Sequence, residues 1–363
     1  MSRQVVRVGL AGILSLAVLA VGGLGVGLTQ VGNRLTVCAS GCDFATIQAA
    51  VNTASAGDTI QVQAGTYKEN VTLQERQNLT LQGAGSDQVT LDGSAGVATQ
   101  KPALFVEKSQ NITVEGFKIV GSRRGVHAVE STGLTLKNSR LENNLRQAIL
   151  INLTQAQLSD LVVTKTKADL DGENGIGVNI FDSQVIMRNA TISESADRGL
   201  ALQGNNNPTL TMDNATVSNN KFTGVALYGS AQITIRNSTV SNNLEEGIFL
   251  TDTARATITN NQITENKKSA GGCCGSGIVA RGASRVTIEG NTIARNVEHG
   301  IWVGDGAGVQ ISGNTIQNNG ECGIWADGIS IMISGSNNTV SSNVKGQLCG
   351  APGKFPKGFG GGK

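Results

Sequence analysis

Apolar residues recur along this chain in a frame that begins with a glycine. The glycine is followed by an apolar, any and an apolar residue, as in Gly300-Ile-Trp-Val, and an apolar pair two positions apart comes next. Alternation over so few residues is typical of short β-strands whose alternate side chains point into a core. The frame starts at Gly224, Gly247, Gly277, Gly300 and Gly323, with spacings of 23, 30, 23 and 23 residues, and extends back through Gly199, Gly175, Ala148, Gly125 and Ala103.

Strands this short cannot bury a core alone, so the repeated units must stack. At about 4.8 Å per step, each strand pairs in parallel with the equivalent strand of the next unit. We therefore predict an all-β, single-stranded parallel solenoid of about eleven coils. The asparagines that close the units should stack as an amide ladder in one turn, and they include Asn144, Asn220, Asn243, Asn266, Asn296 and Asn319.

Both ends of such a solenoid need a cover, because unpaired strand edges invite aggregation. Apolar residues at helical spacing follow Asp43, which predicts a short capping helix with Asp43 as its N-cap. At the other end, residues 351–363 are rich in glycine and lysine, which predicts a flexible tail. The solenoid domain is expected to span residues 36–350.

Residues 1–30 have the pattern of a targeting segment. Two arginines precede an uncharged run of Leu, Val, Ala and Gly, which is typical of an export signal peptide or an uncleaved signal anchor. The whole chain has 29 basic and 27 acidic residues and a formal net charge of +2, which gives no global field for nucleic acid. We expect a secreted or cell-envelope protein with no nucleic-acid partner, and membrane contact only through this N-terminal segment.

Four stretches near the start of the solenoid carry a recognisable pattern. They are Asp43-Phe-Ala-Thr-Ile-Gln-Ala-Ala-Val, Ala56-Gly-Asp-Thr-Ile, Gly65-Thr-Tyr-Lys-Glu-Asn-Val and Asn78-Leu-Thr-Leu-Gln-Gly. Together with the downstream repeats they resemble pectin-lyase-like right-handed parallel β-helix proteins, and the opening is similar to that of pectin methylesterases. The resemblance implies a right-handed coil. It carries no chemistry with it, because the methylesterase motifs are absent and this fold hosts lyases, hydrolases, epimerases, esterases and adhesins.

The residue between the two apolar positions of each unit should face outward. That column reads His127, Leu150, Gly177, Ala201, Ala226, Phe249, Val279, Trp302 and Trp325, and it contains both tryptophans of the chain. A stripe formed by Phe249, Trp302 and Trp325 suits a sugar-binding face, because a flat ring covers the C–H face of a pyranose. The alternative is that a loop or the C-terminal tail covers the tryptophans.

Carboxylates flank this column. Glu298 and Glu321 are one coil apart, so their Cα atoms should lie about 5 Å apart and each carboxylate should raise the proton affinity of the other. A retaining glycosidase needs an acid and a nucleophile at about that separation, and His299 lies beside them. Further acidic candidates for sugar binding are Glu245, Asp305 and Asp327.

The N-terminal half of the same face is basic. Arg123 and Arg146 are candidates for holding a polyanionic sugar, as a polysaccharide lyase would require. A nearby insertion places Asp169, Asp171 and Glu173 around a glycine turn, which is a weak candidate for a Ca²⁺ site. No other cofactor is indicated.

Six cysteines in an exported chain indicate disulfides before metal ligands. Cys38 and Cys42 should close a small clip. We expect a second bond from the inserted loop that contains Cys273 and Cys274 to Cys322 or Cys349 in the last coils. A metal bound by His299 with cysteine thiolates is the open alternative.

Three functions follow from these columns. The leading one is an exported β-helix that binds, and in a stronger form processes, a polysaccharide or cell-envelope glycan along the aromatic and acidic face. One alternative is a catalytically inert structural or adhesive envelope protein. The other is a glycoside hydrolase or polysaccharide lyase that uses Glu298, Glu321 and His299.

Overall fold

The computed structural model describes residues 32–172, 174–269, 271, 274–350, 353–357 and 359. The predicted export segment therefore lies outside the described residues. Within the described part, no helix combines the length and the apolar character that crossing a membrane requires.

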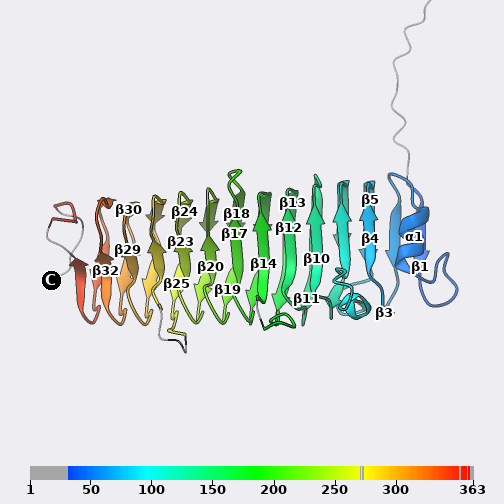
Figure 1. Ribbon diagram of the computed structural model, residues 1–363, viewed down its shortest axis with the longest axis horizontal. Coiled ribbons are helices and arrows are strands. Elements are labelled where there is room, and N and C mark those ends of the chain that lie inside the picture. Colours follow the sequence, from blue (N-terminus) through cyan, green and yellow to red (C-terminus); the bar gives the residue numbers. More distant parts are fainter. Residues whose placement is uncertain are drawn as a thin grey trace, which may run out of the picture. The chain divides into compact units, whose positions relative to one another are not determined.

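Short parallel strands stack into a solenoid, as the alternating pattern predicts (Figure 1). The chain makes about 13 turns, slightly more than the predicted eleven. Each turn adds strands to three stacks, and two of these stacks are joined into a single 23-stranded sheet. They are joined because β11 and β13, the long strands Leu134–Glu142 and Gln155–Thr164, each pair with members of both.

The remaining 12-stranded sheet carries the candidate site, and we call it the site sheet. Its strands, in order, are β4 Val71–Gln74, β7 Leu104–Glu107, β10 Arg124–Val129, β12 Gln147–Asn152, β14 Ile176–Phe181, β17 Leu200–Gln203, β20 Val225–Leu227, β23 Ile248–Leu250, β26 Ile278–Ala280, β29 Ile301–Val303, β32 Cys322–Ala326 and β35 Gly346–Gly350.

The strands that follow the site sheet along each coil form the second stack, and those after the next bend form the third. Besides β11 and β13, the second stack contains β1 Arg34–Val37, β2 Thr59–Val62, β5 Gln77–Gly83, β8 Gln110–Glu115, β15 Gln184–Arg188, β18 Thr209–Asp213, β21 Gln232–Arg236, β24 Arg255–Thr259, β27 Arg285–Glu289, β30 Gly308–Ser312 and β33 Met332–Ser334. The third contains β3 Gly65–Tyr67, β6 Val89–Asp92, β9 Lys118–Val120, β16 Thr191–Ser193, β19 Thr216–Ser218, β22 Thr239–Ser241, β25 Gln262–Thr264, β28 Thr292–Ala294, β31 Thr315–Gln317 and β34 Thr339–Ser341.

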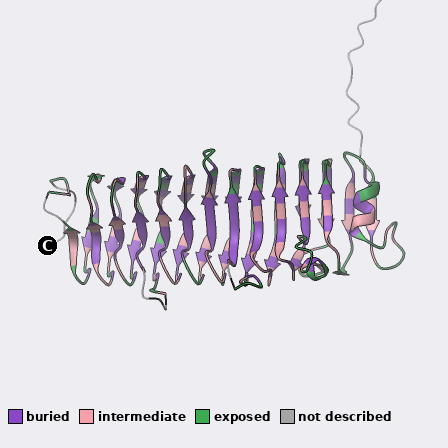
Figure 2. Cartoon of the chain, in the orientation of Figure 1, coloured by how far each residue is buried: buried purple, intermediate pink, exposed green. Residues whose placement is uncertain are grey.

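The core is the inside of the coil. Ile301 and Val303, the inward positions of β29, are fully buried, while Trp302 between them is half-buried on the outside. The same alternation repeats along the strands, and exposed residues gather in the turns (Figure 2). The predicted inward and outward columns are confirmed with one slip: Leu150 pairs with Asn179 rather than Gly177, because the insertion at residues 165–175 shifts the frame by two positions.

The predicted asparagine ladder is confirmed. The Asn266 backbone N–H donates to Asn296 Oδ1 at 3.1 Å, and Asn266 Nδ2 donates to the same oxygen at 2.8 Å. Neighbouring coils repeat this contact, so each buried amide satisfies the next coil's polar groups. A second ladder, not predicted, runs through Asn261, Asn291, Asn314 and Asn338.

Helix α1, Ile47–Thr53, covers the first coil as predicted. Its N-cap is Thr46 and not Asp43, because Thr46 Oγ1 accepts the Ala49 N–H at 3.2 Å. Asp43 instead accepts hydrogen bonds from the backbone and hydroxyl of Thr36. The Gln48 side chain closes the open edge of β4: it donates to Thr72 O at 3.2 Å and accepts from Thr72 N at 2.7 Å.

The C-terminal end is also covered, so the prediction of a flexible tail is wrong for its described part. Phe359 is only 2% exposed and belongs to the core, and Phe355 packs against it with ring centroids 5.6 Å apart. Asn338 Nδ2 donates to Phe359 O at 3.3 Å, which ties this segment to the last rung of the second ladder.

Two disulfides are described in full. Cys38–Cys42 is the predicted clip, and Cys322–Cys349 fastens β32 to β35. The prediction of a bond from the inserted loop to the last coils is therefore wrong, because Cys322 and Cys349 form a disulfide with each other. Cys274 is itself disulfide-bonded, which removes the free thiolate that a metal site with His299 needs, and Cys273 lies outside the described residues.

Candidate functional site on the outer face of the site sheet

The turns that lead into the site sheet shape its outer face. Three insertions, at residues 93–103, 165–175 and 265–277, precede β7, β14 and β26, and they emerge along one edge of the solenoid (Figure 1). From β14 to β32, the glycine at the start of each strand is required by the next coil. A Cβ at Gly300 would lie 2.5 Å from Gly323 O, a contact that no side chain tolerates. The residues just before each of these glycines are thereby held close to the outer face of the site sheet.

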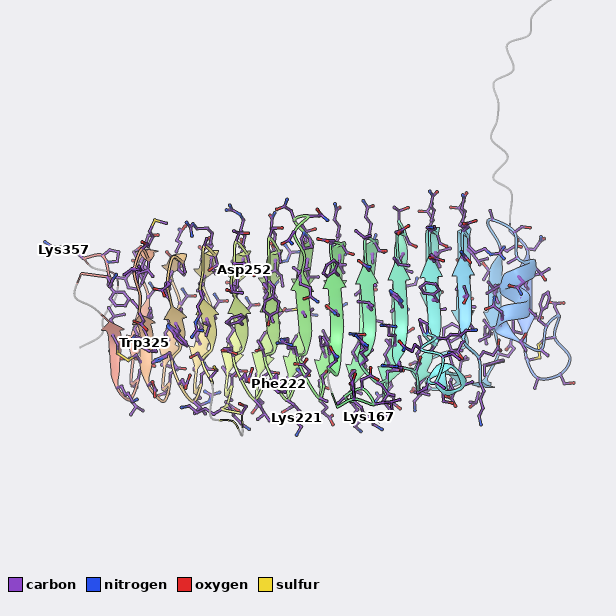
Figure 3. The ribbon with its side chains drawn as sticks, in the orientation of Figure 1. Lys167, Lys221, Phe222, Asp252, Trp325 and Lys357 are labelled. Carbon is purple, nitrogen blue, oxygen red and sulfur yellow. A yellow bond between two sulfur atoms is a disulfide. The ribbon has the colours of Figure 1, made fainter. Side chains whose placement is uncertain are left out.

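The two tryptophans form a stack along the solenoid axis. Trp302 of β29 pairs in register with Trp325 of β32, and their ring centroids lie 5.0 Å apart with planes 20° apart. The Arg281 guanidinium lies over the other face of Trp302, with Cζ 3.8 Å from the ring centroid. Both faces of Trp302 are therefore covered, so its exposed part is the rim. Figure 3 labels Trp325 near the C-terminal end of the sheet.

His299 lies beneath this stack and is 4% exposed. Its ring centroid is 4.4 Å from that of Trp325. Nδ1 accepts the Cys322 backbone N–H at 3.3 Å, so the neutral ring carries its proton on Nε2, which faces Glu321 Oε2 at 3.3 Å. Burial lowers the pKa of His299, while the charges of Glu321 and Glu298 oppose that shift.

Glu298 and Glu321 are neighbours on successive coils, as predicted: the Glu321 backbone N–H donates to Glu298 O at 2.9 Å. Each carboxylate has its own lysine, Lys268 at 2.9 Å from Glu298 and Lys345 at 2.7 Å from Glu321. The hydrogen bond from Lys345 holds the pKa of Glu321 below its usual value despite partial burial. The expected mutual rise in proton affinity is therefore wrong for Glu321, because the lysines supply the neutralising charge.

These side chains enclose one cleft of about 280 Å³. It is lined by Cys274, Arg281, Glu298, His299, Trp302, Glu321 and Trp325. Five residues singled out from the sequence thus come together. The other three acidic candidates do not join them: Asp305 accepts the Ile329 N–H at 2.9 Å in the turn after β29, Asp327 is exposed beyond β32, and Glu245 lies on the middle coils.

A second cluster lies on the middle coils, around Glu245 and Phe249. Phe249 packs against Tyr228, with ring centroids 6.0 Å apart, and Tyr228 Oη accepts from Arg198 Nε at 3.1 Å. Burial raises the pKa of Glu245, and the neighbouring Glu246 adds to the rise. The Thr223 hydroxyl lies between these two carboxyls, 3.4 Å from Glu245 Oε2 and 3.0 Å from Glu246 Oε2. Among the candidate carboxyls, Glu245 is therefore the one whose proton affinity is increased.

Arg123 and Arg146 lie on the N-terminal coils, and both pair with Asp169. The Asp169 side chain is fully buried, and the contact to Arg146 Nη1 measures 3.5 Å. Asp169 is therefore committed to guanidinium groups and does not suit Ca²⁺. Glu173 lies outside the described residues, and the residues that the structure describes contain no group of three or more metal-ligating side chains.

The repeated part of the chain identifies the protein family. A family model described as a right-handed β-helix region matches residues 58–211 and 198–351. The chain belongs to the right-handed β-helix family. The predicted resemblance and the predicted hand of the coil are thereby confirmed.

Individual relatives share this β-helix rather than a demonstrated activity. The A-module of a mannuronan C-5 epimerase from Azotobacter vinelandii has a TM-score of 0.56 at 17% identity, covering 84% of this chain and 95% of that one. The tailspike protein of Dettilon has a TM-score of 0.57 at 14% identity, covering 80% and 62%. At such identities the similarity concerns the fold.

A curated relative matches a smaller part of this β-helix. A cell surface glycoprotein of Methanothermus fervidus is 31% identical over 102 residues, which are 28% of this chain. That match spans only 16% of the glycoprotein. What the whole relative does is therefore not transferred by it.

Several residues of the cleft in this β-helix escape the sequence pattern. Arg281 follows the end of β26, outside the column that contains the tryptophans, although it occupies the same place after its strand as Tyr228 does after β20. Extending the columns beyond the strands would have found it. Lys268 lies in an insertion whose course the repeat does not specify, so no periodic signal marks it. Lys345 does have a periodic position: its backbone N–H donates to Glu321 O at 3.0 Å, as the Glu321 N–H donates to Glu298 O, so it continues the column of the two carboxylates by one coil.

Proposed function

We propose that this β-helix binds a polysaccharide or cell-envelope glycan along the outer face of the site sheet, with the cleft around Trp302 and Trp325 as its main contact. The observation that carries the proposal is the convergence of both tryptophans, His299 and the two carboxylates in one cleft. Aromatic surface packs against sugar rings, and carboxylates accept hydrogen bonds from sugar hydroxyls. The fold shared with a mannuronan C-5 epimerase module is in keeping with such a ligand.

The cleft favours a hydroxyl-rich, uncharged stretch of glycan. Glu298 and Glu321 present carboxylate oxygens, and Lys268, Lys345 and Arg281 bring the charges of the site close to balance. Because Arg281 and Trp325 cover the faces of Trp302, a sugar would meet the rim of the stack and the Arg281 guanidinium. We accordingly assign Arg281 to the binding surface together with the two tryptophans.

A location outside the cytoplasm fits the same proposal. Disulfides persist in oxidising compartments, and two are described in full. The matched stretch of a cell surface glycoprotein points in the same direction. Comparing the mature N-terminus of the exported protein with the encoded one tests the predicted export segment.

Binding of glycans to the full chain tests the main proposal. We expect hits on a glycan array, and a change in tryptophan emission on binding, because the chain has only 2 tryptophans and both lie in the cleft. The double variant Trp302→Ala, Trp325→Ala should weaken binding at least about tenfold, which corresponds to about 1.4 kcal/mol. Phe222→Ala is the matched control, since Phe222 is 41% exposed and lies outside the cleft.

If no glycan binds, the inert structural or adhesive function replaces this one. If glycans bind equally well to the double variant, the binding face lies elsewhere on the solenoid. Retention of native circular dichroism by each variant excludes unfolding as the cause of any loss.

Cleavage of the bound glycan is a second candidate function, favoured by the raised pKa of Glu245. Glycoside cleavage needs a carboxyl that stays protonated until it meets the leaving group. Glu321 is held ionised by Lys345 and suits a nucleophile or a charge stabiliser rather than that acid.

Mass spectrometry of incubated glycans decides the matter. Shortened or unsaturated products that disappear in Glu245→Gln support acid catalysis on the middle coils. Products that disappear only in Glu298→Gln or Glu321→Gln locate the chemistry in the C-terminal cleft. Intact glycans in every incubation leave binding as the function.

A further inference from the structure

Three arginines crowd the N-terminal half of the site sheet, around one buried carboxylate. Arg123 and Arg146 both approach Asp169, whose side chain is fully buried, and Asp169 Oδ1 also accepts the Leu170 N–H at 2.8 Å. Arg124 lies beside them. Among the described residues, two guanidinium groups thus share the Asp169 carboxylate, and the third, that of Arg124, lies within reach of their charges without contacting it.

Arg124 lacks a partner of its own. No hydrogen bond or ion pair of its side chain is found within the described residues, and its Nε is buried without an acceptor. Arg146 Nε, also buried, has none either. Burial lowers the pKa of Arg124, and the charges of Arg146 and Arg123 lower it further. A partly buried cation in this condition is unfavourable until an anion compensates it.

The place of Arg124 in the repeat turns it toward the outer face. It precedes Gly125 as His299 precedes Gly300, and it pairs in register with Gln147 of β12. The pKa of His127, in the outward column, falls to about 4. Burial is the main cause, and the positive charge of Arg124 lowers this pKa further. His127 is therefore neutral near pH 7 and packs against Phe105, with ring centroids 5.2 Å apart.

We propose that Arg124, together with Arg146, binds an anionic group of the glycan, a carboxylate or a sulfate, on the coils of β10 and β12. Arg123 is left to neutralise Asp169. This inference rests on the proposed function only in naming the ligand as a glycan. The site sheet then has two chemically distinct ends: a cationic N-terminal subsite for an acidic sugar, and the aromatic and carboxylate cleft about seven coils further along.

Inorganic anions test the subsite without any glycan. The full chain is heated in sodium sulfate and in sodium chloride at equal ionic strength, as wild type and as Arg124→Gln. We expect sulfate to raise the Tm of the wild type above its value in chloride, and to raise that of Arg124→Gln by less, because the variant keeps only the general stabilising effect of sulfate. In chloride, Arg124→Gln should be at least as stable as the wild type, because it removes a cation that lacks a counter-charge.

Arg255→Gln is the matched control, because Arg255 is an exposed arginine on β24 of the second stack. It should respond to sulfate as the wild type does. An equal response in all three proteins would show a general salt effect on protein surfaces and overturn the inference. A lower Tm of Arg124→Gln in chloride together with a retained sulfate response would show that Arg124 is a structural residue. That outcome would also overturn the inference.

Defined oligosaccharides then separate the possible sources of the anion. Uronate oligomers, sulfated oligomers and a neutral glucan are titrated against the three proteins and against Arg124→Lys at two salt concentrations. The affinity for the recognised acidic oligomer should fall at least about tenfold in Arg124→Gln and be partly restored in Arg124→Lys. The neutral glucan should bind all variants alike.

The two proposals fail in different ways. Sulfate stabilisation that depends on Arg124, without binding of any glycan, supports the anion subsite and defeats the proposed function. Glycan binding that needs the tryptophans but is indifferent to both sulfate and Arg124 preserves the proposed function and overturns the subsite.

Discussion

Replacing Glu321 by glutamine should lower the pH at which His299 takes up a second proton. Glu321 Oε2 lies 3.3 Å from His299 Nε2, and its charge raises the pKa of His299 against the lowering effect of burial. Two charges 4 Å apart interact by about 4 kcal/mol near a protein surface. The Glu321 side chain is 25% exposed and also engages Lys345, so we expect the variant to lose only about 1–2 kcal/mol of this stabilisation of protonated His299.

Tryptophan emission measures this titration. The chain has only 2 tryptophans, both in the stack, and the His299 ring centroid is 4.4 Å from that of Trp325. A protonated imidazole at van der Waals distance quenches indole emission. The wild-type emission should fall on acidification with a midpoint below 6.5, the ordinary pKa of histidine. The midpoint of Glu321→Gln should lie at a lower pH than that of the wild type, because the carboxylate that favours the imidazolium is gone.

Lys345→Gln should move the same midpoint upward, because the lysine charge lowers the pKa of His299. His299→Gln should abolish the transition, and Glu289→Gln, an exposed carboxylate of β27, should leave it in place. An unchanged midpoint in Glu321→Gln, or a transition that survives His299→Gln, would refute the reasoning. Stability has a matching sign: as His299 is harder to protonate in the folded state, the protein loses stability as the pH falls through 6.5 toward the folded pKa.

Three further predictions concern the scaffold. Asn266→Ala leaves two buried N–H donors of the preceding rung without an acceptor, and at about 1–3 kcal/mol each this should lower the free energy of unfolding by roughly 4 kcal/mol in urea titrations. Asn206→Ala, an exposed loop change, should stay within about 0.5 kcal/mol of wild type. Phe359→Ala should cost about 3–5 kcal/mol and speed hydrogen exchange in the last coil; protection equal to wild type would mean that the ring does not cap the core. Replacing both Cys322 and Cys349 by serine opens a loop of 27 residues and should cost about 3–4 kcal/mol, and an unchanged Tm would contradict this estimate.

The repeat could be predicted correctly because its pattern depends only on residues that are close together in the sequence. Alternation identifies inward residues such as Ile301 and outward ones such as Trp302, and stacking at a constant step brings equivalent positions into register. The prediction slipped at Gly177, where an insertion changes the number of residues per coil. The second asparagine ladder escaped because it runs over fewer coils: the coil before Asn261 has Ser238 at the same position.

The chemistry of the cleft could be predicted only in part. The columns placed Glu298, Glu321, His299 and both tryptophans near one another, and the structure gathers them. Their protonation was misjudged, because it depends on Lys268, which reaches Glu298 from an insertion, and on Lys345, which stacks on Glu321 one coil beyond the recognised repeats. The C-terminal tail was misjudged in a similar way: its composition indicates flexibility, but Phe359 finds an uncovered core end to occupy.

By itself, the sequence determined the solenoid, its hand through the family pattern, its inner and outer faces and the residues that line up along each face. These properties repeat every coil, so a period in the chain is enough to specify them. Only the tertiary structure decided which disulfides form, which cation meets which carboxylate and which groups cover the two faces of Trp302. Such contacts join side chains from different coils through non-repeating turns, and their energies depend on burial and distance, which no periodic pattern encodes.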